Sequence, residues 1–272
     1  MNDSNIKNVA VIGSGLIGSS WATLFAMNGL LVSVNDIDDD ALNLAKERIR
    51  NNLVHLASEE IMSEDDIDNI ISRITFTKDI KEAVSKAQFI QENGPDSIGI
   101  KESMLKVIEK NVSEDAIYAT STSALLVSDI AKYAKHPERC IGGHPYNPPH
   151  LIPLVEISTC EVTDKEIVEK ACDFYRSLGK EPVVLKKESM GFIANRLQAA
   201  LNRELVDMVM RGVCSVEDVD KALTFGPGLR WGILGQTLNA HLGGGERGIK
   251  GMIDLTLSSS KAMNSSLANW SD

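Results

Sequence analysis

Short apolar runs alternate with amphipathic stretches through the first half of the chain. Short apolar runs are typical of buried strands, and apolar residues at helical spacing are typical of helices. The predicted strands are 7–12, 30–35, 74–76, 88–91, 116–120 and 140–144. The predicted helices between them are 20–28, 41–57, one that starts at 63–66, 80–87, 98–110 and 126–133. This alternation predicts a doubly wound, mostly parallel sheet of the α/β class.

The pattern changes after about residue 150. It predicts a strand over 154–157, a helix over 164–178 and a strand over 182–185, and no strand from residue 191 onward. Helices are predicted over 191–211, 215–225, 231–241 and 249–257. We expect the polar, serine-rich residues 258–272 to be poorly ordered. The chain should therefore form an α/β domain over 1–188, followed by a smaller all-α domain over 189–272.

The first apolar run leads into a glycine-rich turn, in which residues 13–18 read Gly-Ser-Gly-Leu-Ile-Gly. Gly13 permits a tight turn, Gly15 lets a pyrophosphate approach the backbone, and Gly18 lets the following helix pack on the strand. The free N–H groups at the start of that helix favour a phosphate. The motif predicts a Rossmann-type site whose cofactor contacts are Gly13, Gly15, Leu16, Ile17 and Gly18.

An acidic residue stands at the end of the second predicted strand. Asp36 lies eighteen positions after Gly18, where a dinucleotide site needs a carboxylate for the adenosine ribose. A 2′-phosphate would need an arginine there, and instead Asp38, Asp39 and Asp40 follow. These carboxylates would repel a phosphate, so the sequence predicts NAD as the cofactor.

Composition excludes several other classes of protein. Of the 272 residues 43% are hydrophobic, which is enough for a large core, and the net charge of −10 argues against binding to nucleic acid or an anionic membrane. We expect no membrane span and no signal peptide, and hence a cytoplasmic protein. The four cysteines form no C-x-x-C pair, so we expect reduced thiols and no metal site.

A dehydrogenase needs a base for the hydroxyl proton, and histidine is the usual choice because its pKa lies near working pH. His144 ends a predicted strand at the carboxyl edge of the sheet, where ligands bind. Glu156 follows on the returning strand and could orient the imidazole. The alternative for His144 is an ordinary loop histidine.

Four motifs occur together in order, and the chain carrying them resembles the 3-hydroxyacyl-CoA dehydrogenase family over about residues 7–245. The motifs are the glycine turn, the Ala-Thr-Ser-Thr-Ser segment at 119–123, the His-Pro-Tyr-Asn-Pro segment at 144–148 with Leu-Val-Glu at 154–156, and Gly-Phe-Ile-Ala-Asn-Arg at 191–196. The resemblance implies NAD-dependent oxidation of an L-3-hydroxy group to a 3-keto group.

The resemblance also implies roles for individual residues. His144 would be the base and Glu156 its partner, and Ser123 and Asn195 would hydrogen-bond the reacting oxygen. Further cofactor contacts would be Asp96, Lys101 and Asn147. The family more often has glutamate at the position of Asp96.

Two departures from the acyl-CoA members bear on the substrate. Those members hold CoA with a serine and a lysine where this chain has Asn52 and Glu59, and a glutamate would oppose a CoA phosphate. Residues 226–232 and 241–245 are instead similar to L-carnitine dehydrogenases and, more loosely, to L-gulonate 3-dehydrogenase (lambda-crystallin). Enzymes of that branch use small free carboxylates. The chain ends earlier than they usually do, so we expect its helical domain to lack a final element.

Two residues in the first of these segments are substrate-binding candidates. Arg230 would clamp a carboxylate through two hydrogen bonds. Trp231, with Tyr146 and Phe225, offers an aromatic face for a quaternary ammonium. The alternative is a structural arginine beside a packing tryptophan. The glycines and proline before Arg230 favour a shaped loop that enters a helix.

We therefore expect an NAD-dependent L-3-hydroxy-acid dehydrogenase that acts on a small molecule and forms a homodimer through its helical domain. Oxidation of an L-3-hydroxyacyl-CoA is the first alternative. A non-catalytic NAD-binding structural protein is the second, and the complete set of Ser123, His144, Glu156 and Asn195 disfavours it.

Overall fold

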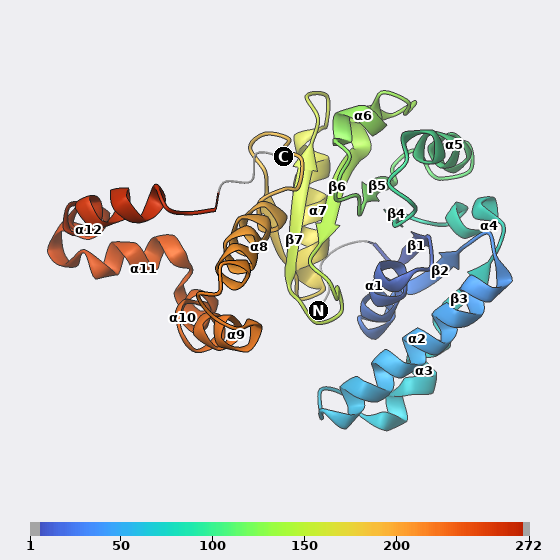
Figure 1. The fold of residues 1–272 in the computed structure, drawn as a ribbon. Coiled ribbons are helices and arrows are strands. Elements are labelled where there is room, and N and C mark those ends of the chain that lie inside the picture. The colour runs from blue at the N-terminus through green and yellow to red at the C-terminus, as the bar shows by residue number, and fades with distance from the viewer. Residues whose placement is uncertain (1–5, 269–272) are drawn as a thin grey trace. The chain divides into compact units, whose positions relative to one another are not determined.

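The computed structural model describes residues 6–268, apart from the side chains of residues 258 and 259. The chain divides into two compact units, Met1–Ala194 and Asn195–Asp272. The strands lie in the first unit, and the described part of the second unit is helical (Figure 1). This is the α/β class with a helical C-terminal region that the hydrophobic pattern predicts.

The strands of the first unit form an eight-stranded sheet in the order β3-β2-β1-β4-β5-β6-β7-β8. They are β1 (Asn8–Ile12), β2 (Leu31–Asn35), β3 (Ile74–Thr77), β4 (Phe89–Glu92), β5 (Ile117–Thr120), β6 (Cys140–Pro145), β7 (Leu154–Thr159) and β8 (Glu181–Val184). Within this sheet only β6 and β7 are antiparallel. The strand order reverses at β1, and a ligand crevice is expected where the carboxyl ends of β1 and β4 separate.

Helices cover both faces of this sheet. One face carries α1 (Leu16–Met27), α2 (Asp39–Ser58), α3 (Ile67–Ile71) and α7 (Lys165–Ser177). The other carries α4 (Ile80–Val84), α5 (Ile98–Ile108) and α6 (Val127–Ala131). Successive side chains of a strand point to opposite faces, so Val9 and Val11 join one buried cluster while Ala10 and Ile12 join the other.

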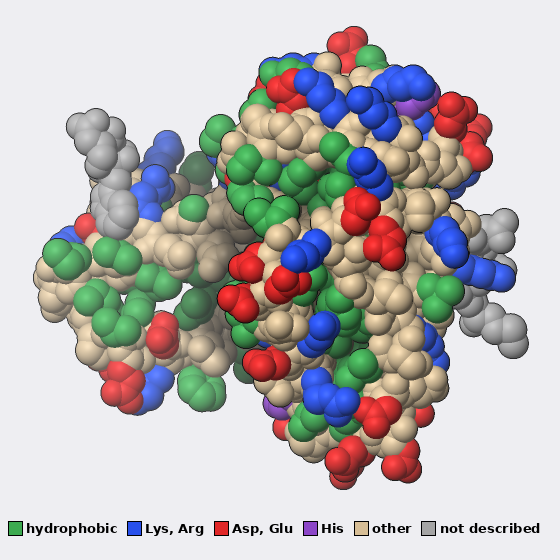
Figure 2. Space-filling model, turned by 90° about the vertical axis from the view of Figure 1, so that its right-hand side faces the viewer, with side chains coloured by type: hydrophobic (Ala, Val, Ile, Leu, Met, Phe, Trp, Pro, Cys, Tyr) green, Lys and Arg blue, Asp and Glu red, His purple; other side chains and the backbone are tan. Residues whose placement is uncertain are grey.

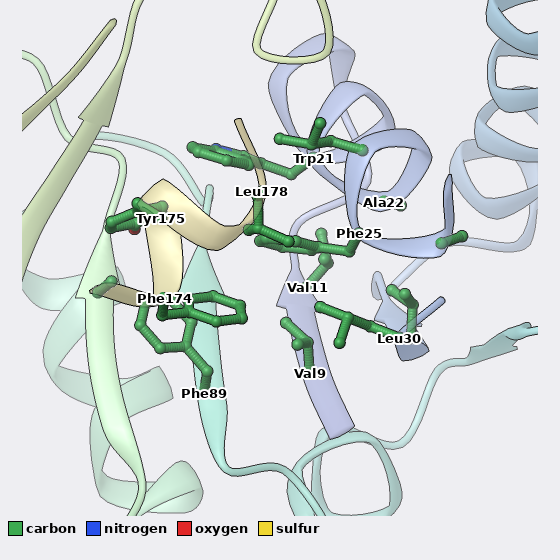
Figure 3. Packing of buried hydrophobic residues seen from close by; sticks show 14 of the residues in the cluster. Val9, Val11, Trp21, Ala22, Phe25, Leu30, Phe89, Phe174, Tyr175 and Leu178 are labelled. Atoms are coloured by element: carbon green, nitrogen blue, oxygen red, sulfur yellow. The ribbon is translucent and has the colours of Figure 1, made fainter. Parts of the chain in front are cut away.

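Aromatic side chains anchor α1 and α7 to the sheet (Figure 3). Trp21 stacks on Phe25 with ring centroids 5.2 Å apart, and Phe174 packs on Phe89 of β4 at 4.5 Å. Truncating a buried aromatic ring of this kind to alanine costs about 3–5 kcal/mol. The packing fixes α1, and hence the glycine turn that precedes it, against the strands that carry the site.

The second unit consists of short and medium helices. They are α8 (Ala194–Met210), α9 (Val216–Phe225), α10 (Pro227–Leu234), α11 (Gln236–Gly243) and α12 (Gly248–Asn264). The start of α9 has the capping box that the sequence indicates, in which the Ser215 hydroxyl accepts from the backbone N–H of Asp218 and the Asp218 carboxylate accepts from Ser215.

Three expectations about this region are wrong. A single helix over 231–241 is interrupted at Gly235, whose φ of 70° suits glycine and ends α10. The segment before Arg230 is not a loop, because α10 begins at Pro227, a residue favoured at the first helical position. Residues from 258 onward were expected to be poorly ordered, yet α12 continues to Asn264 through good helix formers such as Ala262 and Met263. Residues 269–272 lie outside the described residues.

Acidic and basic side chains are interspersed on the face shown in Figure 2. A nucleic-acid surface would gather its lysines and arginines in one patch or stripe.

Within residues 6–268, no helix has the length and apolar character that crossing a bilayer requires.

Candidate active site

The glycine turn has the geometry of a phosphate-binding turn. Gly13 has a φ of 89°, and a Cβ there would lie 2.9 Å from the backbone of Asn93. A Cβ at Gly18 would lie 1.9 Å from the carbonyl oxygen of Gly13, so α1 can approach β1 only without that side chain. A Cβ at Gly15 would meet nothing within 4 Å. The backbone at Gly15, which precedes Leu16 at the start of α1, is therefore open to a ligand.

Asp36 is held in place by the turn itself. Its Oδ2 accepts hydrogen bonds from the backbone N–H and the hydroxyl of Ser14, both at 2.8 Å. Its Oδ1 accepts from the backbone N–H of Ile37 at 2.8 Å. Sequence reasoning missed Ser14, which is buried. Its position between the first two glycines of the motif, opposite an expected acid, was the available signal.

A cavity of about 700 Å³ opens beside these residues at the carboxyl ends of β1 and β4. Its lining includes Gly13, Gly15, Asp36, Asn93 and Lys78. Lys78, which sequence reasoning did not single out, lines this cavity, and its Nζ lies 2.6 Å from Asp39 Oδ2. The open backbone at Gly15 and the oriented carboxylate of Asp36 fit a dinucleotide.

Glu92 of β4 and Lys101 of α5 form the centre of a buried cluster of charged and hydroxyl side chains. The Nζ of Lys101 is 2.7 Å from a carboxylate oxygen of Glu92, and both side chains are fully buried. Glu92 also accepts from the hydroxyls of Thr120 at 2.6 Å and Tyr118 at 3.2 Å. Burial, with the neighbouring Glu92 carboxylate, raises the pKa of Tyr118 well above its ordinary value. In this structure the Lys101 ammonium pairs with the Glu92 carboxylate. A direct contact between Lys101 and the cofactor therefore stays a prediction.

Asp96 connects this cluster to the loop that carries Ser123. Its Oδ1 lies 3.8 Å from Lys101 Nζ, and its Oδ2 accepts from the backbone N–H of Ser123 at 3.3 Å. Ser123 follows β5 and is exposed. The structure therefore brings together two residues, Asp96 and Ser123, that the sequence placed in different roles.

His144 and Glu156 face each other across β6 and β7, where they are register partners. His144 Nδ1 lies 3.1 Å from Glu156 Oε2, and both side chains are buried. A carboxylate can only accept, so Nδ1 carries the proton and Nε2 is left as the nitrogen that can accept one. Burial alone would raise the pKa of Glu156. Hydrogen bonds from His144 and from the backbone N–H groups of Ala194 and Ile193 outweigh it and hold this pKa below its ordinary value.

Asn147 is exposed in the loop that follows β6. Hydrogen bonds from Lys180 and to Ser20 hold this loop in place. The Nζ of Lys180 donates to the backbone oxygens of Pro149, at 2.6 Å, and Ile152. Burial lowers the pKa of Lys180 to about 8. The hydroxyl of Ser20 on α1 accepts from the backbone N–H of His150 at 3.0 Å. These contacts hold the segment between His144 and Glu156.

The remaining predicted residues belong to the second unit. Asn195 is half-buried in the first turn of α8, next in the chain to Ala194, whose N–H donates to Glu156. Arg230 is exposed on α10, and the indole N–H of Trp231 donates to Gln236.

Residues 8–189 match the NAD-binding domain of 3-hydroxyacyl-CoA dehydrogenase, and residues 191–269 match the C-terminal domain of the same enzyme. The chain belongs to the 3-hydroxyacyl-CoA dehydrogenase family. It is an NAD-dependent oxidoreductase, and the glycine turn, Asp36 and the adjoining cavity fit the cofactor that this family binds.

Individual relatives of this dehydrogenase carry different names. It is 40% identical over 241 residues to a 3-hydroxyacyl-CoA dehydrogenase of Gibberella moniliformis, covering 88% of this chain and 73% of the other. It is 39% identical over 252 residues to an L-carnitine dehydrogenase of Oceanobacillus iheyensis, covering 92% and 80%. The solved structure of 5-formyl-3-hydroxy-2-methylpyridine 4-carboxylic acid 5-dehydrogenase, an NAD⁺-dependent dismutase, matches with a TM-score of 0.86 at 33% identity, covering 98% and 83%.

Proposed function

We propose that this dehydrogenase oxidises the L-3-hydroxyl of a small free carboxylate, such as L-carnitine or L-gulonate, to a ketone. The observation that carries the proposal is the similarity to L-carnitine dehydrogenases over more than nine-tenths of the chain, 39% identical over 252 residues in one case. The dismutase of similar fold acts, by its name, on a compound that also bears a carboxylic acid.

Each residue of the site has its own role in the proposed oxidation. NAD⁺, which the glycine turn and Asp36 would hold, would supply the acceptor for the hydride that leaves the carbon bearing the hydroxyl. His144 takes the hydroxyl proton at Nε2, and Glu156 fixes the ring and offsets the positive charge that it gains. Ser123 and Asn195 donate hydrogen bonds to the reacting oxygen, and Asp96 and Asn147 hold the cofactor.

Arg230 is the proposed ligand of the substrate carboxylate, and Trp231 the proposed face for a trimethylammonium group. Arg230 is exposed, and its guanidinium forms no ion pair with another described residue. A guanidinium binds a carboxylate well because two N–H groups match its two oxygens.

The second candidate is an L-3-hydroxyacyl-CoA, favoured by the relative of that name at 40% identity. The positions that hold CoA in acyl-CoA members argue against it. Asn52 is engaged with the hydroxyl of Thr23 on α1 at 3.2 Å, and Glu59 is an exposed acid at the end of α2. An exposed carboxylate repels the phosphates of CoA.

The deciding experiment follows NADH absorbance with L-carnitine, L-gulonate and L-3-hydroxybutyryl-CoA in parallel. We expect kcat/KM to be highest for one of the free acids and to fall by about 10²–10⁴-fold in His144→Ala. Turnover of the thioester alone would replace the small-acid proposal with the acyl-CoA alternative.

We also propose a homodimer formed through the second unit. This unit exposes large apolar side chains such as Met210, Phe225 and Ile233, each more than 70% accessible. A chain that leaves many large apolar side chains in water can bury them by association with a second copy. Light scattering coupled to gel filtration tests the proposal, and a monomer at micromolar concentration would contradict it.

A further inference from the structure

The ring of Phe192 lies flat on the imidazole of His144. The two ring centroids are 4.4 Å apart and the planes differ by 13°. Phe192 is 3% exposed and His144 6%. The pair is therefore a closed stack, in which one face of the imidazole is covered and Nδ1 is occupied by Glu156.

Phe192 adopts an unusual backbone conformation to make this contact. Its φ is 50°, in the left-handed region that bulky side chains rarely occupy. The conformation is maintained by the residues that follow, because the N–H groups of Ile193 and Ala194 donate to Glu156 Oε1 at 2.7 and 3.0 Å. Strained backbone of this kind is common at functional sites, where the surrounding contacts hold it.

One carboxylate thus holds both members of the stack. Glu156 Oε2 accepts from the imidazole, and Oε1 accepts from the turn that presents the phenyl ring. The plane of His144 is set from two directions, by an in-plane hydrogen bond and by a ring on its face. The direction in which Nε2 points is therefore fixed before a substrate arrives.

The stack also bears on charge. The face of an aromatic ring is electron-rich, so it attracts a cation placed over it. His144 is neutral before it accepts the hydroxyl proton and cationic afterwards. A contact that stabilises the cationic form more than the neutral form favours the step in which the charge develops.

We propose that Phe192 is a positioning residue for proton transfer, which fixes the plane of His144 and stabilises the imidazolium that the ring becomes. This inference rests on the proposed role of His144 as the base. Within residues 6–268, the titratable side chain that pairs with the imidazole is Glu156, on the neighbouring strand β7. The phenyl face and this carboxylate therefore act on the same charge.

The first test compares Phe192→Leu with Phe192→Tyr, which keeps the aromatic face. We expect kcat to fall about 3- to 30-fold in Phe192→Leu and to stay within about 3-fold of the unchanged protein in Phe192→Tyr. The acidic limb of the pH profile of kcat/KM should move to lower pH in Phe192→Leu, because a less stabilised imidazolium loses its proton more readily. The dissociation constant for NAD⁺ should not change.

A second test avoids any loss of folding. Site-specific replacement of Phe192 by mono- and trifluorinated phenylalanine keeps the shape of the ring and withdraws electron density from its face. We expect the acidic limb to move stepwise to lower pH with the number of fluorines. The matched control is the same series at Phe174, which is buried against Phe89 in the hydrophobic core of the first unit. Fluorination there should leave the acidic limb in place.

The outcomes separate the two proposals. A fluorine series at Phe192 that leaves the limb in place, with His144→Ala inactive, overturns the role of Phe192 alone. A lower kcat in Phe192→Leu with an unmoved limb and no recovery in Phe192→Tyr also overturns it and leaves Phe192 as packing. Full activity of His144→Ala would instead remove the proposed role of His144 as the base, and this inference with it.

Discussion

His144 and Glu156 are direct partners across β6 and β7, and His144 Nδ1 lies 3.1 Å from Glu156 Oε2. Directly opposed residues of an antiparallel pair have side chains on the same face and close together. The antiparallel pairing of β6 and β7, in an otherwise parallel sheet, therefore brings together two residues that stand twelve positions apart in the chain.

Replacing His144 by alanine should lower kcat by about 10²–10⁴-fold, the usual contribution of a positioned acid–base group. NAD⁺ binding, measured by calorimetry, should be unchanged, because the proposed role of His144 is to take a proton from the substrate and not to hold the cofactor. His55→Ala, on the exposed side of α2, is the control. An active His144→Ala enzyme would rule out His144 as the base.

Replacing Asp36 by alanine should narrow the preference for NAD over NADP. The Asp36 carboxylate is fixed by Ser14 at the cavity, where a 2′-phosphate would meet like charge. The ratio of kcat/KM for the two cofactors measures the effect, with Glu47→Ala, an exposed acid further along α2, as control. Equal use of both cofactors by the unchanged protein would contradict the assignment.

Replacing Arg230 by methionine should raise KM for the true free acid by at least ~10-fold, since hydrogen bonds between charged groups contribute about 1.5–3 kcal/mol. NAD⁺ affinity and turnover of an acyl-CoA thioester should be nearly unaffected. Arg211→Met, which removes an exposed helix pair with Asp207, controls for loss of surface charge. Unchanged kinetics on every small hydroxy acid would dismiss Arg230 as a substrate ligand.

Glu156 should contribute a pH-dependent part of the stability. Its pKa in the folded protein lies below the ordinary 4.5, so the folded state binds the proton less readily than the unfolded state. The contribution is therefore fully present above about pH 4.5 and is lost as the pH falls through the lower folded pKa. Urea unfolding of the unchanged protein and Glu156→Gln should show a free-energy difference that shrinks below pH 4.5. A difference that is constant with pH would contradict this.

Replacing Lys101 by methionine should destabilise the first unit by about 3–5 kcal/mol, because it leaves the Glu92 carboxylate buried without its partner. Lys106→Met removes an exposed pair with Glu102 on the same helix and should cost no more than about 1 kcal/mol. Denaturant midpoints of the two variants measure the contrast. Similar midpoints would mean that water reaches Glu92 when Lys101 is removed.

Local sequence patterns could predict the parts of the site that depend on neighbours in the chain. The glycine turn sets its own geometry, and the apolar run before Asp36 ends where β2 ends, so both were readable from residues close in sequence. The hydrophobic pattern likewise predicted the order of strands and helices in the first unit. It failed at Gly235 and at Pro227, where one residue's backbone preference ends or starts a helix within an otherwise continuous pattern.

The sequence by itself determined the elements, the cofactor turn, and His144 and Glu156 as candidate residues. Only the tertiary structure decided which side chain each of these groups contacts. Ser14 donates a hydrogen bond to Asp36, Lys101 forms an ion pair with Glu92, and Phe192 stacks on His144. Each of these contacts joins residues from different elements, and strand register and helix packing set their distances. Such contacts leave no periodic mark in the sequence, because each depends on the position of a whole element rather than on the residues beside it.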